Sequence, residues 1–267
     1  MSQGAGVFVF EITTPGTGLD YEDRDWSWKI QGLIRNLESQ FFEANLALNL
    51  FVQARAIRPA GLDRASWERD SQRRAEIQRM VEQERGAGSS MESWEEVRFE
   101  AEVRFKREQW GQGRIPREFE HNQPFLFARA FLYSLDAFDK FLGVLSTEAG
   151  VPTEVLDFHA QVARAFPDLR GVRNTAQHLE DRARGLGGMN PKPLDLKPVV
   201  NQMINAPGGG ALILNSLNGS RYGSTMADGH YGEVDVSPES MQQLQCILQG
   251  VLASFRWRGP KQHSPSV

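Results

Sequence analysis

The chain has 267 residues, of which 40% are hydrophobic and 24% charged, and its formal net charge is −4. This length is enough for one large domain, or for a core domain with an appended piece. The slight acidity excludes a global field that attracts nucleic acid, so an RNA-binding surface would have to be local. A single cysteine, Cys246, excludes an intrachain disulfide and a cysteine-based zinc site; its position on an amphipathic helix favours a role as small apolar filler.

The first third of the chain predicts a strand and a long helix. The apolar run VFVFEI, residues 7–12, precedes Pro15-Gly16 and predicts a strand. An acidic cluster follows, which is favourable at a helix N-terminus. Over residues 26–57, apolar side chains recur at three- and four-residue steps, which predicts a helix that Pro59-Ala60-Gly61 ends.

Residues 63–110 predict a charged helical hairpin around the flexible segment GAGSS. Each half has only a thin apolar stripe, so most of its surface is expected in solvent. Four arginines could grip RNA phosphates, namely Arg73, Arg74, Arg104 and Arg107. The interspersed acids favour the alternative, in which these arginines neutralise neighbouring carboxylates.

After the expected loop GQGRIPREFEHNQP comes a helix, residues 125–145, that is apolar around almost its whole circumference and should be buried. Asp136 and Asp139 lie on it, and a buried acid normally needs a partner. Either acid could hold Arg173 or orient His178, or could lie at an exposed edge. The segment TEVLDFHAQVARAF predicts another helix, which Pro167-Asp168 separates from the next.

The C-terminal part predicts strands and a last helix. Over residues 211–236 the apolar period changes to two, and Asn218-Gly219 and Asp228-Gly229 favour tight turns, which predicts a three-stranded meander. Ser237-Pro238-Glu239 has the order of cap, proline and acid that opens a helix over residues 237–256. The sequence therefore predicts a mostly α (α+β) protein. It would be a single domain, 1–267, with a helical bundle over 26–184 that includes the hairpin.

The segment RNTAQHLEDR, residues 173–182, combines residue types that suit RNA cleavage without a metal. His178 can take the proton of a ribose 2′-hydroxyl, and Arg173 offers several donors to a phosphate that gains charge. Asn174 and His178 are four residues apart and would share one helix face. Arg173 and His178 lie roughly 140° apart around a helix, so two copies of the helix would aim them at one phosphate better than one copy.

Two other pairs in the chain have a similar spacing of arginine and histidine. Arg114 precedes His121 across Pro116, where a continuous helix is not expected. Arg258 precedes His263 in the tail RGPKQHSPSV, which should fray. Only the pair of Arg173 and His178 lies within a helical pattern.

With Arg173, four residues and then His178, and with polar Asn174 after the arginine, RNTAQH resembles the motif of HEPN domains. The resemblance covers residues 124–184. It implies a helical bundle, a homodimer with a composite site, and metal-independent endoribonuclease activity in a toxin or an antiviral defence effector. It implies that Arg173, Asn174 and His178 are catalytic, with RNA as the substrate, no metal and no cofactor. An antitoxin or a defence-complex protein would be a further partner.

Neighbouring charged residues complete the predicted site. Four acids are candidates to support the catalytic groups, namely Asp136, Asp139, Glu180 and Asp181. Three arginines are candidates to bind RNA, namely Arg170, Arg182 and Arg184. The alternative is a solvated helix face held by ion pairs. In that case the protein would be a non-catalytic interaction or scaffold module, or would bind RNA without cleaving it.

The sequence also favours a cytoplasmic protein without membrane contact. The first residues, MSQGAGVFVFEITTP, have no basic region, and their apolar run is too short for a signal peptide. No stretch approaches the roughly 20 apolar residues of a membrane span.

Overall fold

The computed structural model describes residues 6–56, 63–85, 91–188 and 192–267. The chain divides into two compact units, one of residues 1–54 and 124–267 (unit 1) and one of residues 55–123 (unit 2). The sequence predicted one domain with the hairpin inside it. The predicted hairpin forms most of unit 2, where its two helices bury their apolar stripes against each other. The predicted helix stop at Pro59-Ala60-Gly61 and the GAGSS segment lie outside the described residues.

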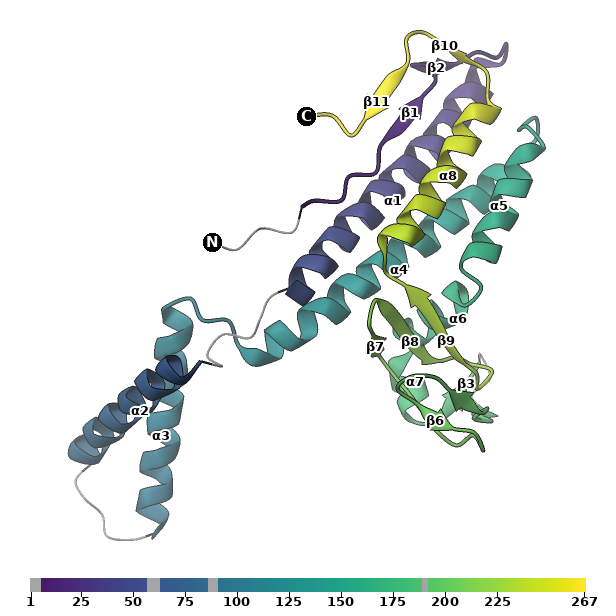
Figure 1. The fold of residues 1–267 in the computed structure, drawn as a ribbon. Helices are drawn as coiled ribbons and strands as arrows, with labels where there is room; N and C mark the ends of the chain where they lie inside the picture. Colours follow the sequence, from purple (N-terminus) through teal and green to yellow (C-terminus); the bar gives the residue numbers. More distant parts are fainter. Residues whose placement is uncertain (1–5, 57–62, 86–90, 189–191) are drawn as a thin grey trace. The chain divides into compact units, whose positions relative to one another are not determined.

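The mostly helical α+β class is confirmed (Figure 1). The described helices are α1 (Arg24–Ala56), α2 (Arg64–Arg85), α3 (Met91–Gly111), α4 (Arg117–Thr147), α5 (Glu154–Ala165), α6 (Leu169–Gln177), α7 (Leu179–Ala183) and α8 (Pro238–Ser254). Helix α4 begins within the segment predicted as a loop, and it contains Pro124. None of the described helices has the length and apolar character that crossing a membrane requires.

One hydrophobic core holds unit 1 together. Helices α1, α4 and α8 run side by side, and α5 packs along α8 (Figure 1). Their buried faces repeat at three- and four-residue steps, as the sequence predicted. The fully buried side chains include Ile30, Ile34, Leu37, Phe41, Leu48, Phe51, Phe131, Leu135, Phe138, Leu142, Leu244, Leu248 and Val251.

The predicted meander is confirmed as an antiparallel sheet of β7 (Ser216–Asn218), β8 (Arg221–Thr225) and β9 (Tyr231–Asp235). Gly219 and Gly229 lie in its turns with φ of +59° and +86°, a region that favours glycine. The first strand is shorter than predicted. Two smaller antiparallel pairs join β3 (Leu186–Gly187) to β4 (Lys192–Pro193), and β5 (Val199–Val200) to β6 (Asn205–Ala206).

The two ends of the chain pair with each other. Strand β1 (Ile12–Thr14) pairs with β11 (Gln262–Ser264), and β2 (Gly18–Leu19) pairs with β10 (Trp257–Arg258) (Figure 1). The expectation of a fraying tail was therefore wrong, because these residues form ladders with the N-terminal segment. The side chain of Gln249 on α8 bonds both the N–H and the carbonyl of Thr13, which ties β1 to the bundle.

The strand predicted at residues 7–12 was wrong for most of its length. Residues 7–11 form no ladder, and the strand begins at Ile12. The backbone of Phe8 is instead held by the side-chain amides of Asn45 and Asn49 on α1. An apolar run therefore satisfies its backbone polar groups with side chains, which a strand pattern alone does not predict.

Candidate functional site

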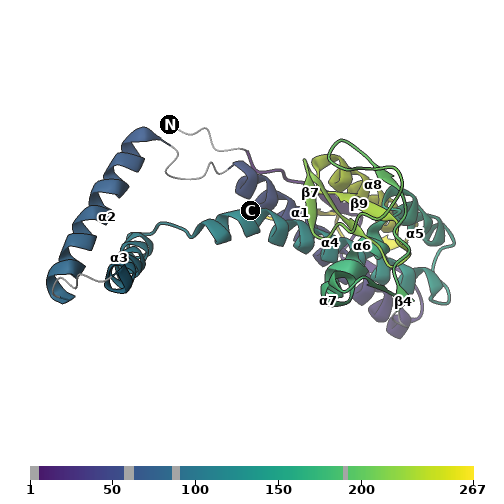
Figure 2. The ribbon, with the colours of Figure 1, turned by 90° about the horizontal axis from the view of Figure 1, so that it is seen from below.

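Helix α6, which carries the Arg173 motif, is fixed to the meander by its buried face. The Thr175 hydroxyl donates to the carbonyl of Thr225 at 3.0 Å, and Asp168 accepts from the N–H of Glu233 at 3.1 Å. A Cβ on Gly171 would lie 2.2 Å from the sulfur of Met226, so a larger residue at this position would require the Met226 side chain to move. Figure 2 shows α6 and α7 beside the sheet. Arg173, on the same helix, contacts Asp136 of α4.

The predicted single helix over residues 173–182 is interrupted at His178. Helix α6 ends at Gln177, α7 starts at Leu179, and His178 between them has φ −125° and ψ 44°. The expectation that Asn174 and His178 share one helix face was therefore wrong, since His178 is not helical. The break moves the imidazole off the line of the α6 side chains.

Arg173 is held by Asp136 of α4. Its Nη2 lies 2.8 Å from the Asp136 carboxylate, and its Nη1 donates to Gln177 at 2.7 Å. The two paired side chains are only 11% and 10% exposed, so water screens their attraction weakly. This is one of the arrangements that the sequence left open for Asp136, and it gives Arg173 a fixed orientation.

Arg173, Asp136 and Lys140 together carry an excess of positive charge. Lys140, one turn along α4, lies 2.7 Å from the second oxygen of Asp136 and is 60% exposed. Two cations therefore share one carboxylate. The Nε of Arg173 is buried and has no hydrogen-bond partner within the described parts of the chain.

His178 is exposed and lies among acids. Its side chain is 57% exposed, and its Nδ1 is 3.9 Å from the carboxylate of Glu180, which is 70% exposed. His178, Glu180 and Asp181 each offer one ligand atom within 4.8 Å of one another, a geometry that could hold a metal ion. Exposed acids often gather without an ion, and the imidazole itself is accessible to a reactant.

The three arginines predicted to bind RNA lie in different environments. Arg170 is exposed. Arg184 is exposed but pairs with Asp181. Arg182 is 4% exposed and donates to the carbonyl of Leu186 at 2.6 Å, so it is closed to RNA in this conformation. The sequence did not predict its burial because charged residues on a short helix normally face solvent.

Sequence reasoning missed His159, which lies close to this group of charges. Its Nε2 is 3.2 Å from Asp139, one turn from Asp136 on α4. Burial raises the pKa of the Asp139 carboxyl, while the nearby His159 lowers it. A Cβ on Gly143 would lie 3.1 Å from the His159 ring, so this glycine lets the imidazole pack on α4. In the sequence, the only indication of this contact was Gly143, four residues after Asp139.

The two competing pairs of arginine and histidine have other contacts. Arg114 lies 2.6 Å from Asp70 of α2, in unit 2. His263 is in β11 and lies 3.3 Å from Glu11, and Arg258 is in β10. Both pairs are thus accounted for by local packing.

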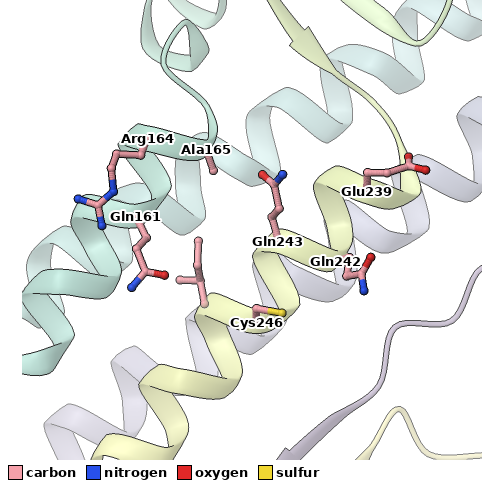
Figure 3. A pocket seen from close by; sticks show the side chains of 8 residues that line it. Gln161, Arg164, Ala165, Glu239, Gln242, Gln243 and Cys246 are labelled. Atoms are coloured by element: carbon pink, nitrogen blue, oxygen red, sulfur yellow. The ribbon is translucent and has the colours of Figure 1, made fainter.

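A separate groove runs between α5 and α8. It has a volume of about 590 Å³ and is lined by Gln161, Arg164, Ala165, Glu239, Gln242, Gln243, Cys246 and Ile247 (Figure 3). Cys246 is exposed here, so the expectation that it fills apolar space was wrong. The groove contains neither Arg173 nor His178.

No family model, curated protein or solved structure matches the chain.

Proposed function

We propose that the chain is a metal-independent endoribonuclease of the HEPN type, acting as a homodimer in a toxin or an antiviral defence system. The observation that supports this most is the contrast within one short helix. Arg173 is oriented by Asp136 at 11% exposure, while His178, at the end of the same helix, presents a 57% exposed imidazole. One group is pre-organised and the other is accessible, as acid–base catalysis beside a bound phosphate requires.

In the proposed reaction, the ribose 2′-oxygen attacks the adjacent phosphorus as His178 accepts its proton. Arg173 stabilises the negative charge of the phosphorane, and Asn174 positions the phosphate. The bond from phosphorus to the 5′-oxygen then breaks, and this oxygen takes up the proton from the His178 imidazolium, directly or through solvent. The products are a 2′,3′-cyclic phosphate and a 5′-hydroxyl, so no water or redox partner is consumed.

A second copy would complete the site. Within one chain, Arg173 contacts Asp136, and His178 lies nearest to the acid Glu180. In the proposed dimer, the accessible imidazole of one copy meets the oriented guanidinium of the other. Lys140 and Arg170, both exposed, would supply local positive charge to an otherwise acidic chain.

The test is cleavage of a mixed RNA substrate in the presence of EDTA, with end analysis of the products. His178→Ala is expected to reduce cleavage by about 10²-fold or more, the typical effect of losing a general base. His230→Ala is the matched control, because His230 is 59% exposed and lies 3.2 Å from Asp228, outside the motif. Equal activity of the His178 and His230 variants, or no cleavage by the unmodified protein, would remove the proposal.

A second candidate is a non-catalytic interaction module of a defence or toxin–antitoxin complex. It is favoured by one specific observation: Arg173 is already engaged in an ion pair with Asp136. This candidate predicts no RNA turnover and unchanged binding of the partner when Arg173 and His178 are both replaced. Adding Mn²⁺ or Zn²⁺ to the cleavage assay separates a third outcome, in which His178, Glu180 and Asp181 hold a catalytic ion.

A further inference from the structure

The hairpin of unit 2 has one apolar face inside and a second one outside. Inside, α3 packs Val97, Ala101 and Phe105 on α2, which contributes Ile77 and Val81. These five side chains form the entire described core of the hairpin. They use one face of α3, and the ring of Phe105 is also covered by the guanidinium of Arg74 at 4.4 Å.

The outer stripe of α3 consists of Phe99, Val103 and Trp110. Phe99 is 72% exposed, Trp110 is 49% exposed, and Val103 is half-buried. At 3.6 residues per turn the stripe points about 180° away from the inner face. Lys106 lies between Val103 and Trp110 on the same face. The four positions 99, 103, 106 and 110 follow one another at steps of four, three and four residues, the spacing of positions that face a partner helix in a coiled coil.

The charges of the hairpin argue against RNA or a membrane as the cover of this stripe. Residues 55–123 contain fourteen Arg and Lys and fourteen Asp and Glu. Many of these form pairs within the hairpin, as in Arg73–Glu108, Arg74–Glu102, Arg85–Glu100 and Arg104–Glu84. Phosphate backbones and anionic lipids both require an excess of basic side chains. Three of the four arginines that might have gripped RNA are thus already paired with carboxylates.

A second copy of α3 complements the charges that flank the stripe. In an antiparallel pair that sets Phe99 opposite Val103 of the other copy, the same register sets Glu96 opposite Lys106. The side chains of Glu96 and Lys106 are 63% and 54% exposed; within one chain Glu96 pairs with Arg85 at 2.7 Å and Lys106 with Glu102 at 3.5 Å, and in the dimer each would exchange that contact for the other copy. A parallel pair would set Glu96 against Glu96 and Lys106 against Lys106, which like-charge repulsion disfavours.

We propose that the outer stripe of α3 is a self-association surface, on which two copies of the chain pair their hairpins in antiparallel fashion. The pairing joins two helical hairpins into a four-helix bundle, in which Phe99 and Val103 of one copy pack on Val103 and Phe99 of the other. The inference is independent of the nuclease proposal, which uses a second copy at the helices of unit 1.

Light scattering after size exclusion tests the surface on the full chain over a range of concentrations. Phe99→Glu is expected to remove one association step and to weaken self-association by about a hundredfold or more, because two Phe side chains leave the interface. Trp28→Glu is the matched control: Trp28 is 71% exposed on α1, outside the stripe, and should leave the mass unchanged. Circular dichroism establishes that each variant is folded.

Charge reversal and cross-linking test the register. Glu96→Lys and Lys106→Glu should each weaken association, and the double variant should restore it, since the swap keeps opposite charges opposed. A benzoylphenylalanine at position 99 should cross-link to residues near Val103 of an isotopically labelled second copy. The proposal is overturned by a monomeric chain at high micromolar concentration, by an unchanged mass of Phe99→Glu, or by cross-links that map to unit 1.

Discussion

The ion pair of Arg173 and Asp136 makes a sharp prediction for stability. Asp136→Asn keeps the shape of the side chain but leaves the nearly buried guanidinium without its carboxylate, since both side chains are about 10% exposed. Breaking one partner of a buried pair costs about 3–5 kcal/mol. We expect the lower end of this range, about 3 kcal/mol, because an Asn oxygen can still accept one hydrogen bond and Gln177 still binds Nη1.

The loss should be visible in thermal unfolding. For a cooperative unit of roughly 150–250 residues, 1 kcal/mol shifts Tm by about 2–4 °C, so Asp136→Asn should lower Tm by about 6–12 °C. Asp228→Asn is the control, because Asp228 is 62% exposed beside His230 and its pair should contribute less than about 1 kcal/mol. Differential scanning calorimetry measures both variants.

A double variant distinguishes the interaction energy of the ion pair from the separate contributions of its two side chains. Replacing both groups by apolar residues, Asp136→Leu with Arg173→Met, should be less destabilising than the sum of the two single changes, because neither leaves a charge unpaired. A Tm change below about 2 °C for Asp136→Asn would refute the reasoning. So would strict additivity in the double variant, since it would mean that the two side chains do not interact energetically.

Two further predictions concern the bundle. Gly250→Ala should destabilise the protein by about 1–3 kcal/mol in urea unfolding, because its Cβ would lie 2.4 Å from the Phe158 ring. Gly32→Ala, whose Cβ would have no atom within 4 Å, should instead stabilise the protein by about 1 kcal/mol. Equal effects of the two substitutions would contradict this account of helix packing. Burial raises the pKa of the Glu38 carboxyl in the folded protein above its ordinary value of 4.5. Above this raised pKa the carboxylate is ionised while buried, which lowers the free energy of unfolding. This penalty vanishes as the pH falls below 4.5, where the carboxyl is protonated in both the folded and the unfolded state. Glu38→Gln, which can still accept the hydroxyl of Thr14, should therefore be more stable than the unmodified protein at pH 7, with a gain that shrinks toward pH 4; a gain that grows on acidification would contradict it.

The helices and the meander were predictable because their signals are local. The predicted helix over residues 26–57 differs from α1, Arg24–Ala56, by two residues or fewer at each end. Ser237 caps α8 as its sequence indicated, with its hydroxyl accepting from the N–H of Ser240. Apolar periods, caps and turn residues act within a few positions along the chain, so they can be read without knowing the fold.

The candidate site was predictable only in part. The residue types at Arg173 and His178 suggested a chemistry, but no local pattern marked the break of the helix at His178. The contact of His159 with Asp139 depends on how α5 lies against α4, with Gly143 leaving room for the ring. Side chains from separate helices meet only after those helices are packed.

The sequence alone determined where most of the helices lie and where three short strands turn. Tertiary structure decided that Arg173 is held by an acid 37 positions earlier, that Arg182 is buried, and that the tail forms a ladder with Ile12 and its neighbours. The physical reason is the range of the interactions. Backbone periodicity is set by neighbours along the chain, whereas burial, charge pairing and strand pairing depend on distances that only the packed core fixes.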